Sequence, residues 1–249
     1  MKDEPDAIVV FDLETTGIDT LNDRIVQAFL GVMGPDGEWI EKREWIVDPL
    51  MEIPQEASDV HGLSTEYVRE HGVMPDLAIE DIINALYWYL QPPKRSLSRR
   101  PLVTFNGCFD LSMLAAEADR YGVVESLDTL PMIDVYVCDK AVDKYRRGSR
   151  KLVNVAPVYD VPVEDNAHDA GADCLMTGRV GWKLINKWQG TLDGLCDKQE
   201  GWAEEQRQSL EDYFEREGKT NEDGSKILIE RGFPVYEKVL TELASRRAS

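Results

Sequence analysis

Two carboxylic acids stand at the end of the first apolar run of the chain. Residues 7–13, AIVVFDL, have the composition of a strand buried on both faces; they contain Asp12, and Glu14 follows two positions later. Side chains alternate along a strand, so both carboxylates point to one side and can converge on a cation. With 47 acids among 249 residues, such pairs also arise by chance, and a solvated strand end is the competing interpretation. Polar groups at strand ends of α/β sheets commonly form binding sites, which favours the cation.

A third acid follows a later apolar run. Asp110, in TFNGCFDLSML, falls near the start of a helix predicted over residues 108–121. An acid in the first helical turn is also favourable simply because of the helix dipole. Its neighbours have structural interpretations too: Phe109 suits a core, and Asn106 begins an Asn-Gly turn.

A histidine and a fourth acid begin another predicted helix, over residues 168–188. His168 and Asp173, in NAHDAGADC, are five positions apart and therefore about 140° apart around a helix, which suits two roles, a base and a metal ligand. His168 is one of three histidines, and a lone histidine is more often structural than catalytic. The spacing leaves Asp169 open as an alternative metal ligand.

The cysteines and the first residues bear on the compartment. Four cysteines occur without a CxxC pair, which excludes a typical zinc site and a dense disulfide framework. Cys108 and Cys174 lie beside the acidic motifs, and we expect them to be packing residues. The start, MKDEPDAIVVFDL, does not resemble a signal peptide, and no apolar run has the length of a membrane span. These features predict a soluble, cytoplasmic protein with reduced thiols.

The elements that must position these residues form a mixed α/β sheet. Five strands are predicted, over residues 7–13, 24–33, 38–47, 102–105 and 132–137. Helices are expected from Ser64 and from Asp76, each residue acting as an N-cap, and over residues 108–121, 151–159 and 168–188. Residues 49–62 are expected to be a loop. The order β-β-β-α-β-α-β-α-α predicts a five-stranded sheet flanked by helices.

The last part of the chain differs in character. Residues 189–249 are expected to be a C-terminal extension packed on a main domain of residues 1–188. A helix over residues 201–217 would present Trp202, Leu210, Tyr213 and Phe214 on one side, and residues 226–233 are a possible strand.

Four motifs together resemble a known family. FDLETTG, VHGLS, NGCFDLSML and HDAGAD, in this order across residues 7–188, resemble the DEDDh (DnaQ-like) 3′–5′ exonucleases. The resemblance implies a ribonuclease H-like fold, in agreement with the predicted element order. It implies that Asp12, Glu14, Asp110 and Asp173 are the metal-binding acids and that His168 is the general base. Thr15, His61, Asn106 and Phe109 match positions near the 3′-terminal nucleotide. Phe105 and Gly107 depart from the family pattern, which commonly has His and Ala there.

The implied chemistry is two-metal hydrolysis of a phosphodiester. Two divalent cations, Mg²⁺ or Mn²⁺, suit carboxylate ligands. We expect Asp12 to bridge both ions, Glu14 and Asp173 to complete the site of the ion that carries the attacking water, and Asp110 to hold the second. A neutral His168 would accept the proton of that water, and a 5′-nucleoside monophosphate would leave the 3′ end.

The substrate and partners are less defined by the sequence. Single-stranded DNA is favoured; an exoribonuclease of oligoribonuclease or tRNA-trimming type, a binding subunit, or a proofreading subunit of a separate polymerase are alternatives. The net charge of −19 argues against a broad basic surface. Basic residues cluster at Lys94, Arg95, Arg99 and Arg100 and again at Lys144, Arg146, Arg147, Arg150 and Lys151. Solvated loops are the simpler interpretation of both clusters, and the second is placed to guide the substrate backbone.

Overall fold

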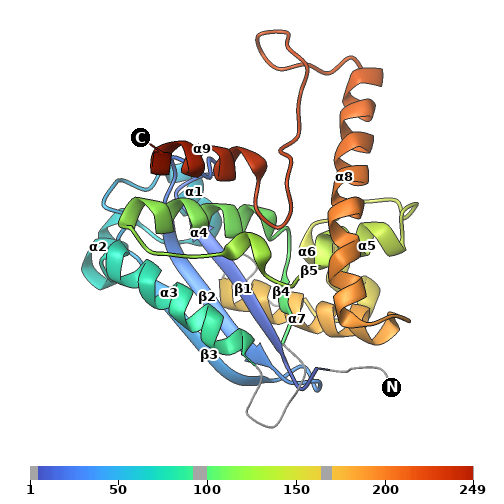
Figure 1. Cartoon of the computed structure of the whole chain (residues 1–249), viewed down its shortest axis with the longest axis horizontal. Helices are drawn as coiled ribbons and strands as arrows, with labels where there is room; N and C mark the ends of the chain where they lie inside the picture. Colours follow the sequence, from blue (N-terminus) through green and yellow to red (C-terminus); the bar gives the residue numbers. More distant parts are fainter. Residues whose placement is uncertain (1–4, 92–99, 164–169, 249) are drawn as a thin grey trace.

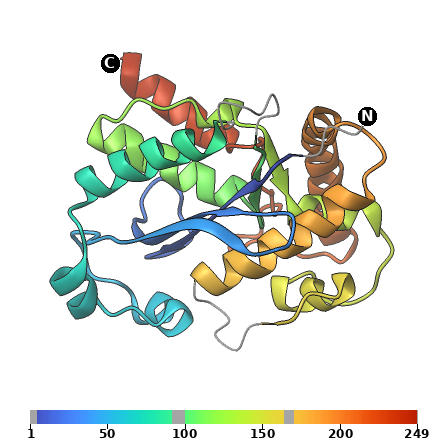
Figure 2. The same cartoon turned by 90° about the horizontal axis from the view of Figure 1, so that it is seen from below.

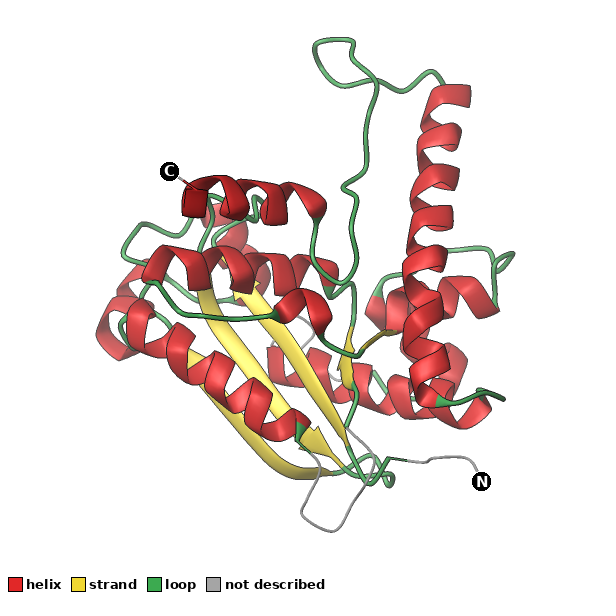
Figure 3. Ribbon diagram, in the orientation of Figure 1, coloured by secondary structure: helices red, strands yellow, loops and turns green. Residues whose placement is uncertain are grey.

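A computed structural model describes residues 5–91, 100–163 and 170–248. Its single sheet has the order β3-β2-β1-β4-β5 (Figures 1 and 3). The strands are β1 (Ile8–Thr15), β2 (Ile25–Met33), β3 (Trp39–Ile46), β4 (Leu102–Thr104) and β5 (Met132–Asp134). The first three form an antiparallel meander, and β4 and β5 run parallel to β1. The predicted mixed five-stranded sheet is confirmed.

Helices cover both faces of this sheet (Figure 2). The helices are α1 (Gln55–His61), α2 (Thr65–His71), α3 (Pro75–Leu90), α4 (Cys108–Tyr121), α5 (Val135–Val142), α6 (Leu152–Val155), α7 (Ala170–Lys187), α8 (Leu192–Arg216) and α9 (Glu237–Ala248). Short 3-10 turns lie at Leu127–Thr129 and Ala156–Tyr159. Helices α3 and α4 pack on one face, α7 packs on the other, and α9 lies on α4.

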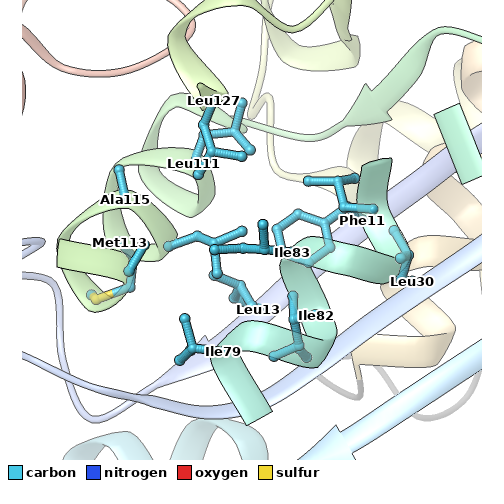
Figure 4. Packing of buried hydrophobic residues seen from close by; sticks show 14 of the residues in the cluster. Phe11, Leu13, Leu30, Ile79, Ile82, Ile83, Leu111, Met113, Ala115 and Leu127 are labelled. Carbon is cyan, nitrogen blue, oxygen red and sulfur yellow. The ribbon is translucent and has the colours of Figure 1, made fainter. Parts of the chain in front are cut away.

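The side chains of β1 point alternately to the two faces of the sheet and so contribute to two separate halves of the core. Phe11 and Leu13 pack with α3 and α4 (Figure 4), whereas Ile8 and Val10 belong to the cluster on the α7 side. The first four residues of β1 and the whole of β2 are buried, as strands covered on both faces should be. Because residues two apart share a face, Asp12 lies on the α7 side of the sheet, at the end of the strand.

Several predicted boundaries were wrong. The strand expected over residues 132–137 ends at Asp134, whose side chain accepts hydrogen bonds from the backbone N–H groups of Tyr136 and Val137 and so begins α5. The loop expected over residues 49–62 contains α1. Ser64 caps α2 as predicted, but α3 begins after Met74 with Pro75 in its first turn, so Asp76 is not its N-cap.

The C-terminal residues also differ from expectation. Helix α8 begins nine positions before the predicted start, residues 226–233 form no strand, and α9 was not predicted. Helix α8 packs on α5 and β5, while Val235, Val239 and Leu243 join the core cluster beside α4. The buried amide of Gln199 accepts from the N–H of Asp134 (2.7 Å) and donates to the carbonyl of Met132 (2.8 Å). This α8 side chain therefore makes the hydrogen bonds that a sixth strand would make with β5.

In residues 5–91, 100–163 and 170–248, no helix is long and apolar enough to cross a membrane. All four cysteines, which lie within these ranges, are free; three are buried and Cys196 is half-buried. Burial raises the pKa of the Cys108 and Cys138 thiols, which keeps them protonated and agrees with the predicted packing role of Cys108.

Candidate active site

The first two predicted acids lie where β1 passes beyond its parallel neighbour. β4 pairs with Val9 and Val10 and ends at Thr104, so the last residues of β1 extend past it. The N–H of Val9 faces β4 and donates to the carbonyl of Pro101, and alternation turns the N–H of Leu13 to the same edge. At that point no strand carbonyl of β4 remains. Both Asp12 and Glu14 are half-buried there.

Asp110 takes the position that β4 leaves open. Its carboxylate accepts the N–H of Leu13 at 3.1 Å, and the side chain is only 4% exposed. Asp110 lies in the first turn of α4, so the chain between β4 and α4 decides where it points. Burial raises the pKa of Asp110 to about 8 against the opposing effect of two backbone N–H groups, its own and that of Leu13.

Asp173 joins these residues from α7, which packs on the sheet face opposite to α4. It lies in the first turn of α7, which packs on β1, and is half-buried. Burial, followed by the charges of Asp110, Glu14 and Asp173, raises the pKa of Asp12 well above its ordinary value. Three elements thus bring the four predicted carboxylates close enough to repel one another.

This donor set has the chemistry of a site for hard divalent cations. Crowded carboxylates are stabilised by a positive ion, and oxygen ligands are what Mg²⁺ and Mn²⁺ prefer. The described ranges hold no group of three His, Cys, Asp or Glu side chains already in coordinating positions. His168 and Asp169, the predicted base and the alternative ligand, lie outside the described residues.

Two predicted nucleotide-binding residues meet at the end of β1. The Oγ1 of Thr15 donates to the carbonyl of Gly17 at 2.7 Å. His61, half-buried at the end of α1, accepts the N–H of Leu63 on Nδ1. Burial lowers the pKa of His61, and a hydrogen bond with the backbone of Thr15 opposes this effect. A neutral imidazole therefore lies beside Thr15, on the same strand end as the acids.

The other two predicted nucleotide-binding residues precede Asp110. Asn106 is exposed and has a left-handed backbone with φ of 63°, which Asn tolerates better than most residues. Phe109 is half-buried against the α3–α4 core, as its structural interpretation suggested. The structure places Asn106 in the turn between β4 and α4 and Phe109 in the first turn of α4.

Comparison with known proteins decides the family. Residues 9–180 match the family model described as RNase T, exonuclease. The chain belongs to this exonuclease family. Its expected ribonuclease H-like fold is thereby confirmed, together with the resemblance drawn from the motifs.

Relatives of the family resemble the chain at low identity. Exonuclease DPD1 of Arabidopsis thaliana, chloroplastic/mitochondrial, is 27% identical over 195 residues, which are 76% of this chain and 59% of the plant protein. The PolC-type DNA polymerase III of Lacticaseibacillus paracasei is 25% identical over 176 residues, 71% of this chain and 11% of the polymerase. The chain thus spans three fifths of the plant relative and about a tenth of the polymerase.

Solved structures of exonuclease I share the fold. Escherichia coli exonuclease I in complex with a dT13 oligonucleotide has a TM-score of 0.60 at 18% identity, over 74% of this chain and 41% of that one. Exonuclease I from Methylocaldum szegediense has the same TM-score and identity over 81% of this chain and 45% of its own.

The two departures from the family motif have structural reasons in this chain. A Cβ atom at Gly107 would lie 2.1 Å from Oγ1 of Thr104, so the backbone approaches β4 too closely for alanine. Phe105 packs edge-on against Tyr136, with ring centroids 5.8 Å apart, and joins the α7-side core. Gly107 thus fits its close approach to Thr104, and Phe105 fits its contact with Tyr136.

Sequence reasoning missed Asp134, which positions the β4–α4 turn. Its buried carboxylate accepts the N–H groups of Asn106 (3.0 Å) and Gly107 (2.9 Å) while it caps α5. One side chain thus joins the end of β5 to the turn before Asp110. In the sequence, Asp134 stands at the end of an apolar run. It predicts a helix N-cap only when residues 135–142 are recognised as a helix rather than as part of the strand.

Proposed function

We propose that this exonuclease-family chain is a metal-dependent 3′–5′ exonuclease acting on single-stranded DNA and releasing 5′-nucleoside monophosphates. The observation that carries the proposal is the convergence of Asp12, Glu14, Asp110 and Asp173 at the end of β1, where burial and then the charges of the other three acids raise the pKa of Asp12. Carboxylates gathered in this way on a nuclease fold suit cation-assisted hydrolysis of a phosphodiester.

The four acids would hold two divalent cations, Mg²⁺ or Mn²⁺. When bound, such ions activate water and offset charge on the reacting phosphate and the leaving oxygen. The protein supplies the frame: β1 fixes Asp12 and Glu14, the Leu13 hydrogen bond fixes Asp110, and α7 carries Asp173.

Other side chains would orient the substrate and move the proton. His168 is proposed to accept the proton of the attacking water. Thr15 and the neutral His61, adjacent at the end of β1, would contact the terminal sugar. Asn106, in the turn held by Asp134, and Phe109, in the first turn of α4, would contact the terminal base. All four positions come from the family resemblance. The hydrogen bond of His61 with the backbone of Thr15 and the closeness of Asn106 and Phe109 to Asp110 in the chain support them.

Similar proteins support DNA as the substrate. The exonuclease I structures were solved with dT13 and dA16 oligonucleotides, and five relatives are PolC-type DNA polymerases. The polymerase relatives favour a second candidate, proofreading in trans for a separate polymerase. A cytoplasmic location stays a prediction, and the plant relative is chloroplastic/mitochondrial.

We also propose that residues 1–188 are the catalytic unit and 189–249 an extension fixed to it. The family match ends at residue 180. The Gln199 bonds to β5 and the packing of α9 on α4 support a fixed extension.

The test is a time course on 3′- and 5′-labelled single-stranded DNA and RNA, with Mg²⁺, Mn²⁺ or EDTA. We expect stepwise shortening from the 3′ end, faster on DNA, and none in EDTA. Asp12→Ala should abolish hydrolysis while circular dichroism stays unchanged. Asp76→Ala, an exposed acid of α3, is the matched control and should keep full activity. Metal-independent hydrolysis, or an active Asp12→Ala protein, would disprove the proposal.

A separate variant tests the proposed base. His168→Ala should lose most activity while Mn²⁺ binding, followed by isothermal titration, is retained. Loss of Mn²⁺ binding together with activity would make His168 a metal ligand instead.

A further inference from the structure

A basic cavity lies between α5, the turn at residues 143–151 and α8. Its volume is about 440 Å³. Five cationic side chains line it: Lys140, Lys144, Arg146, Arg150 and Arg216. The only acid in the lining is Glu205. In a chain with a net charge of −19, this concentration of positive charge marks a place built for an anion. We call it the α5–α8 cavity.

Two of its arginines, Arg146 and Arg150, are held in place by the buried side chain of Asp139. The buried carboxylate of Asp139 accepts two hydrogen bonds from Arg146, at 2.8 and 2.6 Å, and one from Arg150 at 2.7 Å. Arg146 also lies 3.8 Å from Asp143. Arg150 donates further to the backbone carbonyls of Asp143 and Arg146. The guanidinium groups are therefore fixed in position, while Asp139 offsets one of their two charges.

No acidic side chain neutralises the other three cations among the ion pairs of the described residues. Within the described part of the chain, no ion pair involves Lys140 or Lys144, and Arg216 donates to the backbone carbonyl of Asp212. Lys140 lies 4.7 Å from the ring centre of Tyr136. These three side chains come from α5, the turn that follows it and α8.

Aromatic rings stand among the cations. Trp202 of α8 packs edge-on against Trp188, with ring centroids 6.0 Å apart. Tyr213, which is 40% exposed, lies about three helical turns further along the same side of α8. Cations alternating with fixed aromatic rings are typical of surfaces that bind single-stranded nucleic acid, since phosphates take the charges and bases stack on the rings.

The α5–α8 cavity adjoins a second cavity that reaches the turn before α4. This second cavity has a volume of about 170 Å³, and Asn106 and Cys108 are among the residues that line it. It shares Lys140, Gln206 and Leu210 with the α5–α8 cavity. A strand whose terminus lies near Asn106 can therefore reach the basic cavity through adjoining space.

We propose that the α5–α8 cavity holds the substrate strand on the 5′ side of its terminal nucleotide. Phosphates would lie against Lys140, Lys144 and Arg216, and bases against Trp202 and Tyr213. The proposal rests on the proposed function, because it assigns the path of the same substrate. It gives α8, which lies beyond the family-matched residues 9–180, a direct part in binding. It also lets a chain with a net charge of −19 hold a polyanion through a local cluster of cations.

Binding in EDTA tests the proposal without hydrolysis. Fluorescence anisotropy is measured with an oligothymidylate long enough to span both cavities and with a labelled dinucleotide. Lys144→Glu should weaken oligothymidylate binding about tenfold, and each lost phosphate contact should reduce the salt dependence (log K against log salt) by about 0.7. Lys42→Glu is the matched control, because Lys42 is exposed on β3 at the opposite edge of the sheet.

A second variant separates stacking from charge. Tyr213→Ser should weaken binding about fivefold with an unchanged salt dependence, since it removes a ring on which a base would stack and leaves the charge of the cavity unchanged. Dinucleotide binding should be equal in all variants, because a dinucleotide does not reach the cavity.

Hydrolysis in Mg²⁺ distinguishes the two proposals. If the wild-type protein binds through the cavity but does not hydrolyse, the strand path stands and the nuclease function fails. If it hydrolyses, and Lys144→Glu binds the oligothymidylate as tightly as Lys42→Glu does, the strand path is wrong; the cavity then suits an acidic protein partner instead.

Discussion

The backbone N–H of Leu13 donates to the carboxylate of Asp110 across 97 residues of sequence. The bond exists because β4 ends at Thr104 and leaves this N–H without a strand partner. A side chain of α4 thus completes the edge of β1 at the very residue between Asp12 and Glu14. Because β4 is short, Asp110 can bind the edge of β1 and lie close to Asp12 and Glu14.

Asp110→Asn separates the two roles of this side chain. The amide oxygen can still accept the N–H of Leu13, so the free energy of unfolding in EDTA should stay within about 1 kcal/mol of wild type. Activity should fall on the order of a hundredfold, since a charge aimed at the reacting centre is lost. Urea denaturation and the labelled-oligonucleotide assay measure the two effects.

Asp110→Ala is the companion variant, because it removes the acceptor as well. It should be about 1–3 kcal/mol less stable than Asp110→Asn. Equal stability of the two variants would show that the Leu13 bond contributes nothing, and full activity of either would remove Asp110 from the site.

Gly107→Ala should destabilise the protein although alanine is usual at this family position. The added Cβ would stand 2.1 Å from Oγ1 and 2.5 Å from Cβ of Thr104, so β4 or the turn must shift. We expect a loss of about 1–3 kcal/mol, as for other overpacked sites, and reduced activity because Asp110 follows in α4. Thermal denaturation checks the first effect.

The double variant Gly107→Ala/Thr104→Ala gives the control. It removes Oγ1 and Cγ2 of Thr104 but retains the Cβ contact, so it should restore part of the lost stability. A single Gly107→Ala protein as stable as wild type would show that the approach is not constraining.

Asp134→Ala should both destabilise the fold and misplace the nucleotide-binding turn. Four buried or half-buried N–H groups, of Asn106, Gly107, Tyr136 and Val137, lose their acceptor. We expect a loss of about 2–4 kcal/mol, combining a lost helix cap with unsatisfied donors. If Asn106 contacts the terminal base, the KM for oligonucleotide should also rise.

Asp76→Ala is again a suitable control, since Asp76 lies in the first turn of α3 without acting as its N-cap. An Asp134→Ala protein with wild-type stability and KM would show that the turn holds its shape without this carboxylate.

Much of the fold was predictable because its signals are local. The buried runs at β1 and β2 and the apolar stripe of α3 follow directly from residue periodicity. The proposed catalytic acids could be selected as a set only through the order of four motifs. No single spacing distinguishes Asp110 from an ordinary first-turn acid.

What could not be predicted depends on contacts between distant residues. The extent of β5 depends on Asp134, whose capping of α5 ends the strand, although VYV continues a β-like pattern. The tail residues 226–233 resemble a strand in composition but cross from α8 to α4 in extended form, with the N–H of Ile229 bound by Glu211. Periodicity carries no information about these partners.

Gln199→Met should detach α8 from the sheet edge. Met has nearly the same length but neither accepts from the N–H of Asp134 nor donates to the carbonyl of Met132, so two buried backbone groups lose their partners. We expect a loss of about 2–4 kcal/mol in urea denaturation and faster amide exchange in β5. Gln208→Met, an exposed position of the same helix, is the matched control and should change stability by less than about 0.5 kcal/mol.

Because α8 also forms one wall of the α5–α8 cavity, Gln199→Met should weaken oligothymidylate binding without altering dinucleotide binding. Unchanged exchange in β5 would show that the strand edge is protected by something other than this amide.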